Sequence, residues 1–143
     1  MEAVVTDTSV ASLLHPRKRR STLLAWYEPH LRGKALVLSF QSVAELWSWG
    51  VENRWTRKDF RRLERFLGRF IVVPSDLELA RVWAEVTAHC KKRGRRLESG
   101  DAWIIATAVQ RRLPLVTHDA DHLGLRIPKL EVISALAETT ESP

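Results

Sequence analysis

Four acidic side chains in this sequence occupy positions where a parallel sheet would gather them. Asp7 and Asp119 each follow a short aliphatic run. Glu45 and Asp101 are each expected in the first turn of a helix. Ligands of open parallel sheets bind outside the carboxyl ends of the strands. All four carboxylates are therefore expected to converge on one edge of a sheet.

Four carboxylates at one edge need a compensating positive charge. Like charges a few ångströms apart repel by on the order of several kcal/mol, and partial burial adds a desolvation cost. A hard divalent cation such as Mg²⁺ or Mn²⁺ would offset that cost, because it takes oxygen ligands. It would also lower the pKa of a bound water and neutralise charge that develops on a phosphodiester. The acids together predict a metal-dependent nuclease site.

Each acid taken alone also has a structural explanation. Ser42–Glu45 fits a capping box, in which the glutamate returns a hydrogen bond to the helix start. Ser99 can cap a helix that places Asp101 near the positive end of its dipole. Asp7 can close the first strand with an Asx turn. Each such role is worth about 1 kcal/mol and could explain one acid by itself. The site hypothesis therefore depends on the four acids taken together.

The elements that must position these acids form an α/β pattern. Five aliphatic runs have the length of buried strands, and segments with helical periodicity separate them. The runs are 3–5, 35–38, 70–73, 113–116 and 130–133. This alternation predicts a mostly parallel sheet of about five strands with helices on both faces. The segment Asp101–Arg112 is apolar on nearly every side, which predicts a buried helix. Further capping boxes are expected at Thr56–Asp59 and Ser75–Glu78.

The chain of 143 residues fits one domain, which we expect over 1–137, with a polar tail at 138–143. The start MEAVVTD lacks the features of a secretion signal and the chain has a single cysteine, so we expect a cytoplasmic protein. Cys90 lies on the apolar side of a helix and is expected in the core. The net charge of +6 suits a polyanionic partner such as nucleic acid.

Two basic clusters, Arg17–Arg20 and Lys91–Arg96, have two interpretations. Such runs are commonly solvated faces, and they can also follow a phosphate backbone. The second cluster precedes Asp101 in the sequence, which favours a role in delivering RNA to the metal. The residues that we expect to contact RNA are Arg93, Arg95 and Arg96.

Four segments resemble the PIN-domain ribonucleases, and within that family the VapC-type toxins of bacterial and archaeal toxin–antitoxin pairs. They are 4–9, 42–46, 100–108 and 115–119, so the resemblance spans almost the whole chain. It implies a parallel sheet between helices, with acids at one end that hold Mg²⁺ or Mn²⁺. It also implies an RNA substrate, a cognate VapB-type antitoxin that binds the early helices, and a homodimer.

By this resemblance the catalytic, metal-holding acids are Asp7, Glu45, Asp101 and Asp119, with Glu45 acting directly or through water. They would activate a water for in-line attack on RNA, leaving 5′-phosphate and 3′-hydroxyl ends. Ser9 and Thr117 match the family's hydroxyls beside the first and fourth acids, where they would orient a carboxylate or hold water. Asp121 is a secondary ligand candidate. Many relatives have Phe after this acid, whereas this chain has His122 and Leu123.

The tryptophans divide into expected core residues and candidate contacts. Trp47, Trp83 and Trp103 lie on or within apolar stripes, which predicts core positions. Trp26, Trp49 and Trp55 are less clearly inward, and Trp26 and Trp49 fit either an antitoxin contact or the core.

Three alternatives stay open. A catalytically inactive PIN-like RNA-binding or regulatory module is opposed by the presence of all four acids. A phosphatase of the haloacid dehalogenase type needs an acid where this chain has Ser9. His118 and His122 could bind Zn²⁺, or they could be ordinary loop histidines beside the site.

Overall fold

The computed structural model describes residues 2–140 and contains a five-stranded parallel sheet with the order β3-β2-β1-β4-β5. The strands are β1 (Ala3–Thr6), β2 (Ala35–Ser39), β3 (Ile71–Val73), β4 (Leu115–Val116) and β5 (Val132–Ile133). Every pairing is parallel, and Thr6 is in register with Val116. Asp7 and Thr117, which follow these partners, therefore leave the sheet side by side. The predicted strands and the α/β class are confirmed.

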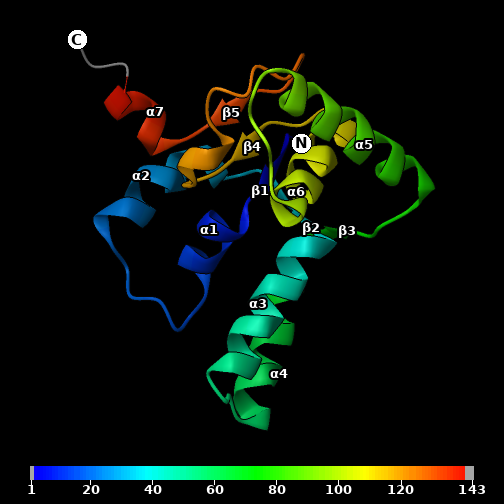
Figure 1. The fold of residues 1–143 in the computed structure, drawn as a ribbon. Coiled ribbons are helices and arrows are strands. Elements are labelled where there is room, and N and C mark those ends of the chain that lie inside the picture. Colours follow the sequence, from blue (N-terminus) through cyan, green and yellow to red (C-terminus); the bar gives the residue numbers. More distant parts are fainter. Residues whose placement is uncertain (1, 141–143) are drawn as a thin grey trace.

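Helices cover both faces of the sheet. Successive strand residues point to opposite sides, and on β1 the residues on both sides are apolar and buried. On β1, Val5 packs in a core with α5 (Leu77–Lys92) and α6 (Ser99–Arg111). Its neighbour Val4 packs on the opposite face with Tyr27 and Leu31 of α2 (Thr22–Leu31). Figure 1 shows α5 and α6 on one side of the strands and α1 (Thr8–Ala11) and α2 on the other. The sheet edge is thus held between two apolar layers.

Helix α6 is the buried element that the sequence predicts. Residues 104–108 are all buried, and α6 contacts both α5 and the central strands. Arg112 ends the helix in the left-handed conformation, with φ of 56°. The predicted core position of Cys90 is also confirmed, because its side chain is fully buried in the same core. Burial of this helix fixes the position of Asp101 in its first turn.

Helices α3 (Phe40–Glu52) and α4 (Arg57–Leu67) form a hairpin that extends away from the sheet (Figure 1). The turn between them has the predicted capping box, in which Thr56 and Asp59 bond each other's backbone N–H groups. The helices approach closely at Gly50, where an added Cβ would lie 2.7 Å from the rings of Trp55 and Phe60. A larger residue at this position would separate the two helices.

The predictions for Trp47 and for the cap of α5 are wrong. Trp47 is 37% exposed and stacks on Phe60 rather than lying in the core, whereas Trp55 is buried. Asp76, rather than Ser75, caps α5 by accepting a hydrogen bond from the Leu79 N–H. The remaining tryptophans that were expected inside, Trp83 and Trp103, pack against the main core.

The C-terminal segment begins with α7 (Ala135–Thr140), which follows β5. This helix includes the first part of the expected polar tail, and residues 141–143 lie outside the described part of the chain. Two short 3₁₀ turns, η1 (Ser12–Leu14) and η2 (Ala120–His122), follow α1 and β4 respectively. Within residues 2–140, no helix is both long and apolar enough to cross a membrane.

Candidate metal centre

Asp7 lies at the centre of the acidic edge and is 3% exposed. It follows β1 and caps α1, where its Oδ1 accepts a hydrogen bond of 2.7 Å from the Thr8 N–H. Its Oδ2 accepts hydrogen bonds from the hydroxyls of Ser9 at 2.9 Å and Thr117 at 2.6 Å. Three donors thus hold this buried carboxylate in one orientation. Both hydroxyls implied by the family resemblance therefore orient the first acid.

Ser9 and Thr117 also connect the two strand ends. The Ser9 hydroxyl accepts a hydrogen bond of 3.0 Å from the His118 N–H, and the Thr117 hydroxyl accepts one of 3.0 Å from the Asp119 N–H. Each hydroxyl thus bonds Asp7 and the backbone that follows β4. The first and fourth acids are positioned by one continuous network.

Asp101 enters the edge from the first turn of α6, with its side chain 22% exposed. Burial raises the pKa of this carboxyl, the neighbouring His122 lowers it, and the charges of Asp119 and Asp7 raise it. The helix start packs closely on α3, because an added Cβ at Gly100 would lie 2.8 Å from the Gln41 amide nitrogen. Glycine before Asp101 permits this close approach.

Glu45 lies one turn further along its helix than the sequence suggests. The predicted capping box at Ser42–Glu45 is wrong, because α3 begins at Phe40 and its cap is Ser39, which leaves Glu45 in the second turn. Thr8 bonds Glu45 Oε2 at 2.8 Å and the Ser42 hydroxyl at the same distance. Burial raises the pKa of Glu45, the Thr8 hydrogen bond lowers it, and the charge of Asp7 raises it. The carboxyl of Glu45 therefore interacts electrostatically with the other acids at this edge of the sheet.

Asp119 and Asp121 lie on the loop after β4. The Asp119 side chain is 36% exposed, and its Oδ1 accepts a hydrogen bond of 2.9 Å from the Asp121 N–H. Oxygen atoms of Asp101, Asp119 and Asp121 lie within 4.8 Å of one another, although Asp121 is exposed. A second group with the same spacing combines Asp119 with Asp7 and His122. Asp119 is common to both groups.

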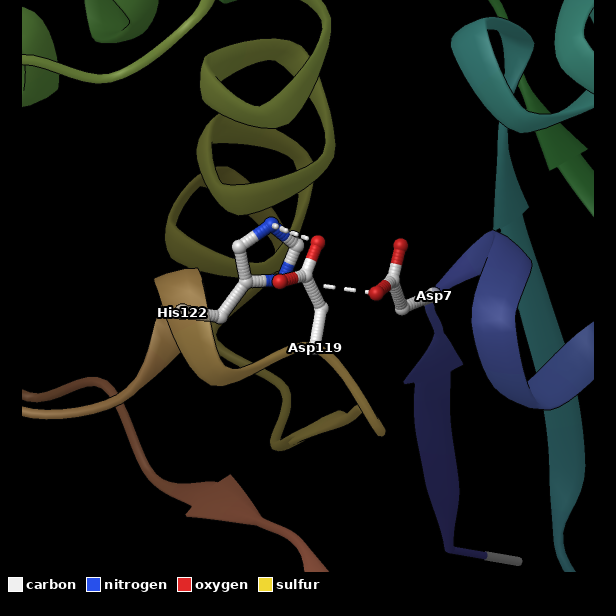
Figure 2. A group of neighbouring side chains, drawn as sticks. All are labelled: Asp7, Asp119 and His122. Atoms are coloured by element: carbon white, nitrogen blue, oxygen red, sulfur yellow. Dashed lines mark ion pairs between the residues drawn. The ribbon is translucent and has the colours of Figure 1, made fainter. Parts of the chain in front are cut away.

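His122 is a residue whose role the sequence left open between a metal ligand and an ordinary loop histidine. Its side chain is fully buried, and its Nδ1 lies 3.4 Å from Asp7 Oδ2. Its Nε2 lies 3.2 Å from Asp101 Oδ1 and 3.9 Å from Asp119 Oδ2. Figure 2 shows the ring beside the carboxylates of Asp7 and Asp119. Its burial among three carboxylates is not expected of an ordinary loop histidine, and the departure from the family's Phe at this position was the signal that pointed to it.

His118, in contrast, turns away from the acids. Its Nδ1 lies 2.7 Å from the Tyr27 hydroxyl, which also donates a hydrogen bond of 2.9 Å to the Thr117 carbonyl. The same hydroxyl accepts a hydrogen bond from the Ala135 N–H. His118 thus belongs to the contact between α2 and the sheet edge, and it shares no metal group with His122.

The donor set fits a divalent metal. Carboxylate oxygens from several elements meet at one edge, and hydroxyls fix the orientation of the most buried one. His122 Nε2 is buried, and no group among the described residues makes a hydrogen bond with it. A lone pair on this nitrogen facing carboxylates is costly unless a proton or a metal ion lies between them. The arrangement can therefore hold an ion at the point where the strands end.

The basic residues expected to bind RNA are all exposed and lie between α5 and α6. Arg93 forms the C-cap of α5. Arg95 donates hydrogen bonds to the carbonyls of Asp121 at 3.3 Å and Leu123 at 3.1 Å. Arg95 therefore supports the loop that carries His122, which is a structural role the sequence did not suggest.

Comparisons with known proteins agree with this arrangement. The PIN domain family matches residues 4–127 of the chain. The chain is 32% identical over 125 residues to VapC ribonuclease Y4jK of Sinorhizobium fredii, which covers 81% of this chain and 86% of that protein. It is 42% identical over 53 residues to ribonuclease VapC5 of Mycobacterium tuberculosis, which covers 37% of this chain and 39% of that protein.

A solved structure shares both the fold and part of the sequence. It is the crystal structure of a member of the VapBC family of toxin-antitoxin systems, VapBC-5 from Mycobacterium tuberculosis. The TM-score is 0.68 at 29% identity, and the match covers 94% of this chain and 99% of that chain. The likeness therefore extends over nearly the whole of both chains.

Proposed function

The chain belongs to the PIN-domain family, and from this premise we propose that it is a metal-dependent endoribonuclease, the toxin of a VapBC-type pair. The observation that carries the proposal is the convergence of Asp7, Asp101 and Asp119 on one edge of the sheet. Relatives named as VapC ribonucleases support the activity. All acids expected of an active enzyme are present, which favours catalysis over an inactive RNA-binding module.

The chain's own residues would prepare the site for an Mg²⁺ or Mn²⁺ ion. Asp7, Asp101 and Asp119 would hold it, and Glu45 would act on its water shell through the position fixed by Thr8. The ion would supply an activated water and neutralise charge on the phosphodiester. Ser9 and Thr117 would keep the Asp7 carboxylate aligned, because both hydroxyls donate to the same oxygen.

The partners follow from the same proposal. RNA would approach over the exposed basic segment 93–96, and its binding would weaken as salt is raised. A VapB-type antitoxin would bind the chain and inhibit it; the solved relative is a member of the VapBC family of toxin-antitoxin systems, which supports this proposal. We also propose a homodimer. Trp49 packs against Trp55 in the hairpin cluster, and Trp26 stacks on His30, so each retains only part of its surface for an antitoxin.

Cleavage of total RNA tests the proposed activity. Wild-type protein is incubated with RNA and Mg²⁺, Mn²⁺ or EDTA, beside the variants Asp101→Asn and Glu64→Gln. Glu64 is an exposed acid on α4 and provides a matched carboxylate-to-amide control. We expect cleavage with either metal, none with EDTA, loss in Asp101→Asn and normal cleavage in Glu64→Gln.

The result has a clear contrary outcome. If Asp101→Asn folds by circular dichroism and cleaves RNA as fast as the wild type, the assigned site is wrong. If the wild type cleaves equally well in EDTA, the proposed metal dependence is wrong. Mapping the product ends distinguishes hydrolysis that leaves 5′-phosphate from cleavage by the RNA's own 2′-hydroxyl.

A further inference from the structure

The proton positions around His122 follow from its neighbours. The Thr117 hydroxyl has one hydrogen, which it donates to Asp7 Oδ2 at 2.6 Å. The same hydroxyl oxygen lies 3.2 Å from His122 Nδ1, so the hydrogen in this contact must come from Nδ1. In the neutral imidazole, Nε2 then carries a lone pair rather than a hydrogen. The lone pair faces the acidic edge.

The polar atoms that lie nearest to Nε2 are hydrogen-bond acceptors. Asp101 Oδ1 and Asp119 Oδ2 lie 3.2 Å and 3.9 Å away. Neither carboxylate can donate when ionised, and no hydrogen bond reaches Nε2 from any described residue. A buried acceptor without a partner is destabilising. A proton on Nε2, or a metal ion between the nitrogen and the carboxylate oxygens, would remove this conflict.

The atom separations are those of neighbouring metal ligands. Bonds of about 2.1 Å place adjacent ligand atoms about 3.0 Å apart in an octahedral site. Similar bonds place them about 3.4 Å apart in a tetrahedral site. The separation of 3.2 Å between Nε2 and Asp101 lies between these values. Asp119 is the most exposed of the acids near the ring and can move to close its longer separation.

We propose that His122 Nε2 is a direct ligand of the metal, beside the carboxylates of Asp101 and Asp119, with Asp7 facing the same ion. The inference rests on the proposed metal-dependent function and adds a nitrogen ligand to an otherwise oxygen-based site. Nδ1 is fixed by Thr117, as the second nitrogen of a metal-bound histidine commonly is. Thr117 therefore orients both the first acid and the imidazole.

A nitrogen ligand changes which metal the site prefers. Mg²⁺ is a hard ion that binds oxygen ligands and keeps much of its water. Imidazole suits transition metals, whose affinity for nitrogen sites rises along the series from Mn²⁺. The site is therefore selective for Mn²⁺ over Mg²⁺, and His122 is the residue responsible for this selectivity.

Electron spin echo envelope modulation of Mn²⁺-loaded protein tests the ligand directly. The full chain is dialysed against EDTA, loaded with Mn²⁺ and measured as wild type, His122→Phe and His118→Phe. We expect ¹⁴N modulation from a bound imidazole in the wild type and in His118→Phe, and its loss in His122→Phe. Labelling with ¹⁵N-histidine must convert the wild-type signal to that of ¹⁵N, which keeps the test valid if His122→Phe fails to fold.

Calorimetry measures the selectivity in the same proteins. The expected result is a Kd for Mn²⁺ that rises at least about tenfold in His122→Phe, while the Kd for Mg²⁺ changes much less. Absence of histidine modulation in the Mn²⁺-loaded wild type would overturn the proposal. An unchanged ratio of Mn²⁺ to Mg²⁺ affinity in His122→Phe would also overturn it. So would tighter binding of both ions by His122→Phe, because that result would show that the protonated ring competes with the metal for the carboxylates.

Failure of this inference is distinguishable from failure of the proposed function. Wild-type protein that cleaves RNA with metal and shows no nitrogen coupling would refute only the ligand assignment. Protein that binds Mn²⁺ through His122 and cleaves no RNA would refute the proposed activity and leave the metal ligand in place.

Discussion

Two histidines in this protein are both buried, but their side chains have different surroundings. His15 and His122 are each about 2% exposed or less, and in both the Nε2 atom has no hydrogen-bond partner among the described residues. His15 lies among the rings of Trp49, Trp55 and Phe66. His122 lies among carboxylates.

The two imidazoles also have opposite proton arrangements. His15 Nδ1 accepts a hydrogen bond of 3.1 Å from the Arg17 N–H, so its Nε2 carries the hydrogen in the neutral ring. Burial lowers the pKa of His15, and the charge of Arg17 lowers it further. The aromatic cluster therefore keeps His15 neutral. At His122 the lone pair faces acids instead, and the environment attracts a cation.

The difference shows that burial and an unpartnered nitrogen do not by themselves identify a functional histidine. An apolar cage makes the residue part of the packing, whereas an acidic cage makes it part of a binding site. The charges of the neighbours decide between these roles. The following experiments alter one side of this contrast at a time.

The largest effect is expected for Asp7→Asn, which removes a charge from the centre of the acidic cage. Because the amide neither neutralises the ion nor accepts both hydroxyl hydrogen bonds well, RNA cleavage should fall by about 100-fold or more. Cleavage rates in Mn²⁺ measure the effect, with circular dichroism as the folding control. A folded variant with wild-type rates would remove Asp7 from the site.

Thr117→Val tests the hydroxyl that serves both Asp7 and His122. Leaving these buried groups without their partner should cost about 1–3 kcal/mol of unfolding free energy. It should also weaken Mn²⁺ binding by about tenfold, because the hydroxyl orients the ligands. The control is Thr6→Val, since Thr6 is equally buried but its hydroxyl bonds only the Val37 carbonyl. Equal metal affinities in the two variants would show that Thr117 has only a structural role.

The sequence predicted the acidic side of the contrast better than the histidines. Asp7 and Asp119 follow strands, and the rule for parallel sheets places residues at such positions on one edge. The sheet itself could be predicted because short buried aliphatic runs have few alternative structures. Glu45 was misplaced within its helix, since Ser39 and Ser42 both have the chemistry of a cap.

The side-chain environments could not be predicted from spacing. His118 and His122 lie on the same short loop, yet the 3₁₀ turn at Ala120–His122 directs only one of them into the acids. Burial of His15 depends on aromatic rings from two helices that are distant in sequence. Local pattern carries no information about such tertiary contacts, and the partial exposure of Trp47 has the same origin.

His15→Phe alters the aromatic side of the contrast. The folded protein holds the pKa of His15 below its ordinary 6.5, so the unfolded chain binds the extra proton first as pH falls. The stability that this residue contributes is present above pH 6.5 and is lost as pH falls through the lowered pKa. Urea unfolding between pH 7.5 and 5 should show a smaller loss of stability in His15→Phe than in the wild type. Parallel curves for the two proteins would contradict this account.

The smallest effect is expected for Arg95→Ala, which removes the support of the loop that carries His122. Because Arg95 is exposed, loss of its hydrogen bonds to Asp121 and Leu123 should raise amide exchange in residues 119–124 only a few-fold. Arg96→Ala is the matched control of equal charge. If both variants weaken RNA binding equally and neither alters exchange, Arg95 acts only through its charge.

Anomalous diffraction from a crystal soaked in Mn²⁺ tests most directly whether the carboxylate edge is a metal centre. The account predicts one strong anomalous peak bounded by Asp7, Asp101, Asp119 and His122 Nε2, and none at His15. A well-ordered crystal with this edge accessible and no peak there, or a peak held only by residues elsewhere, would contradict it.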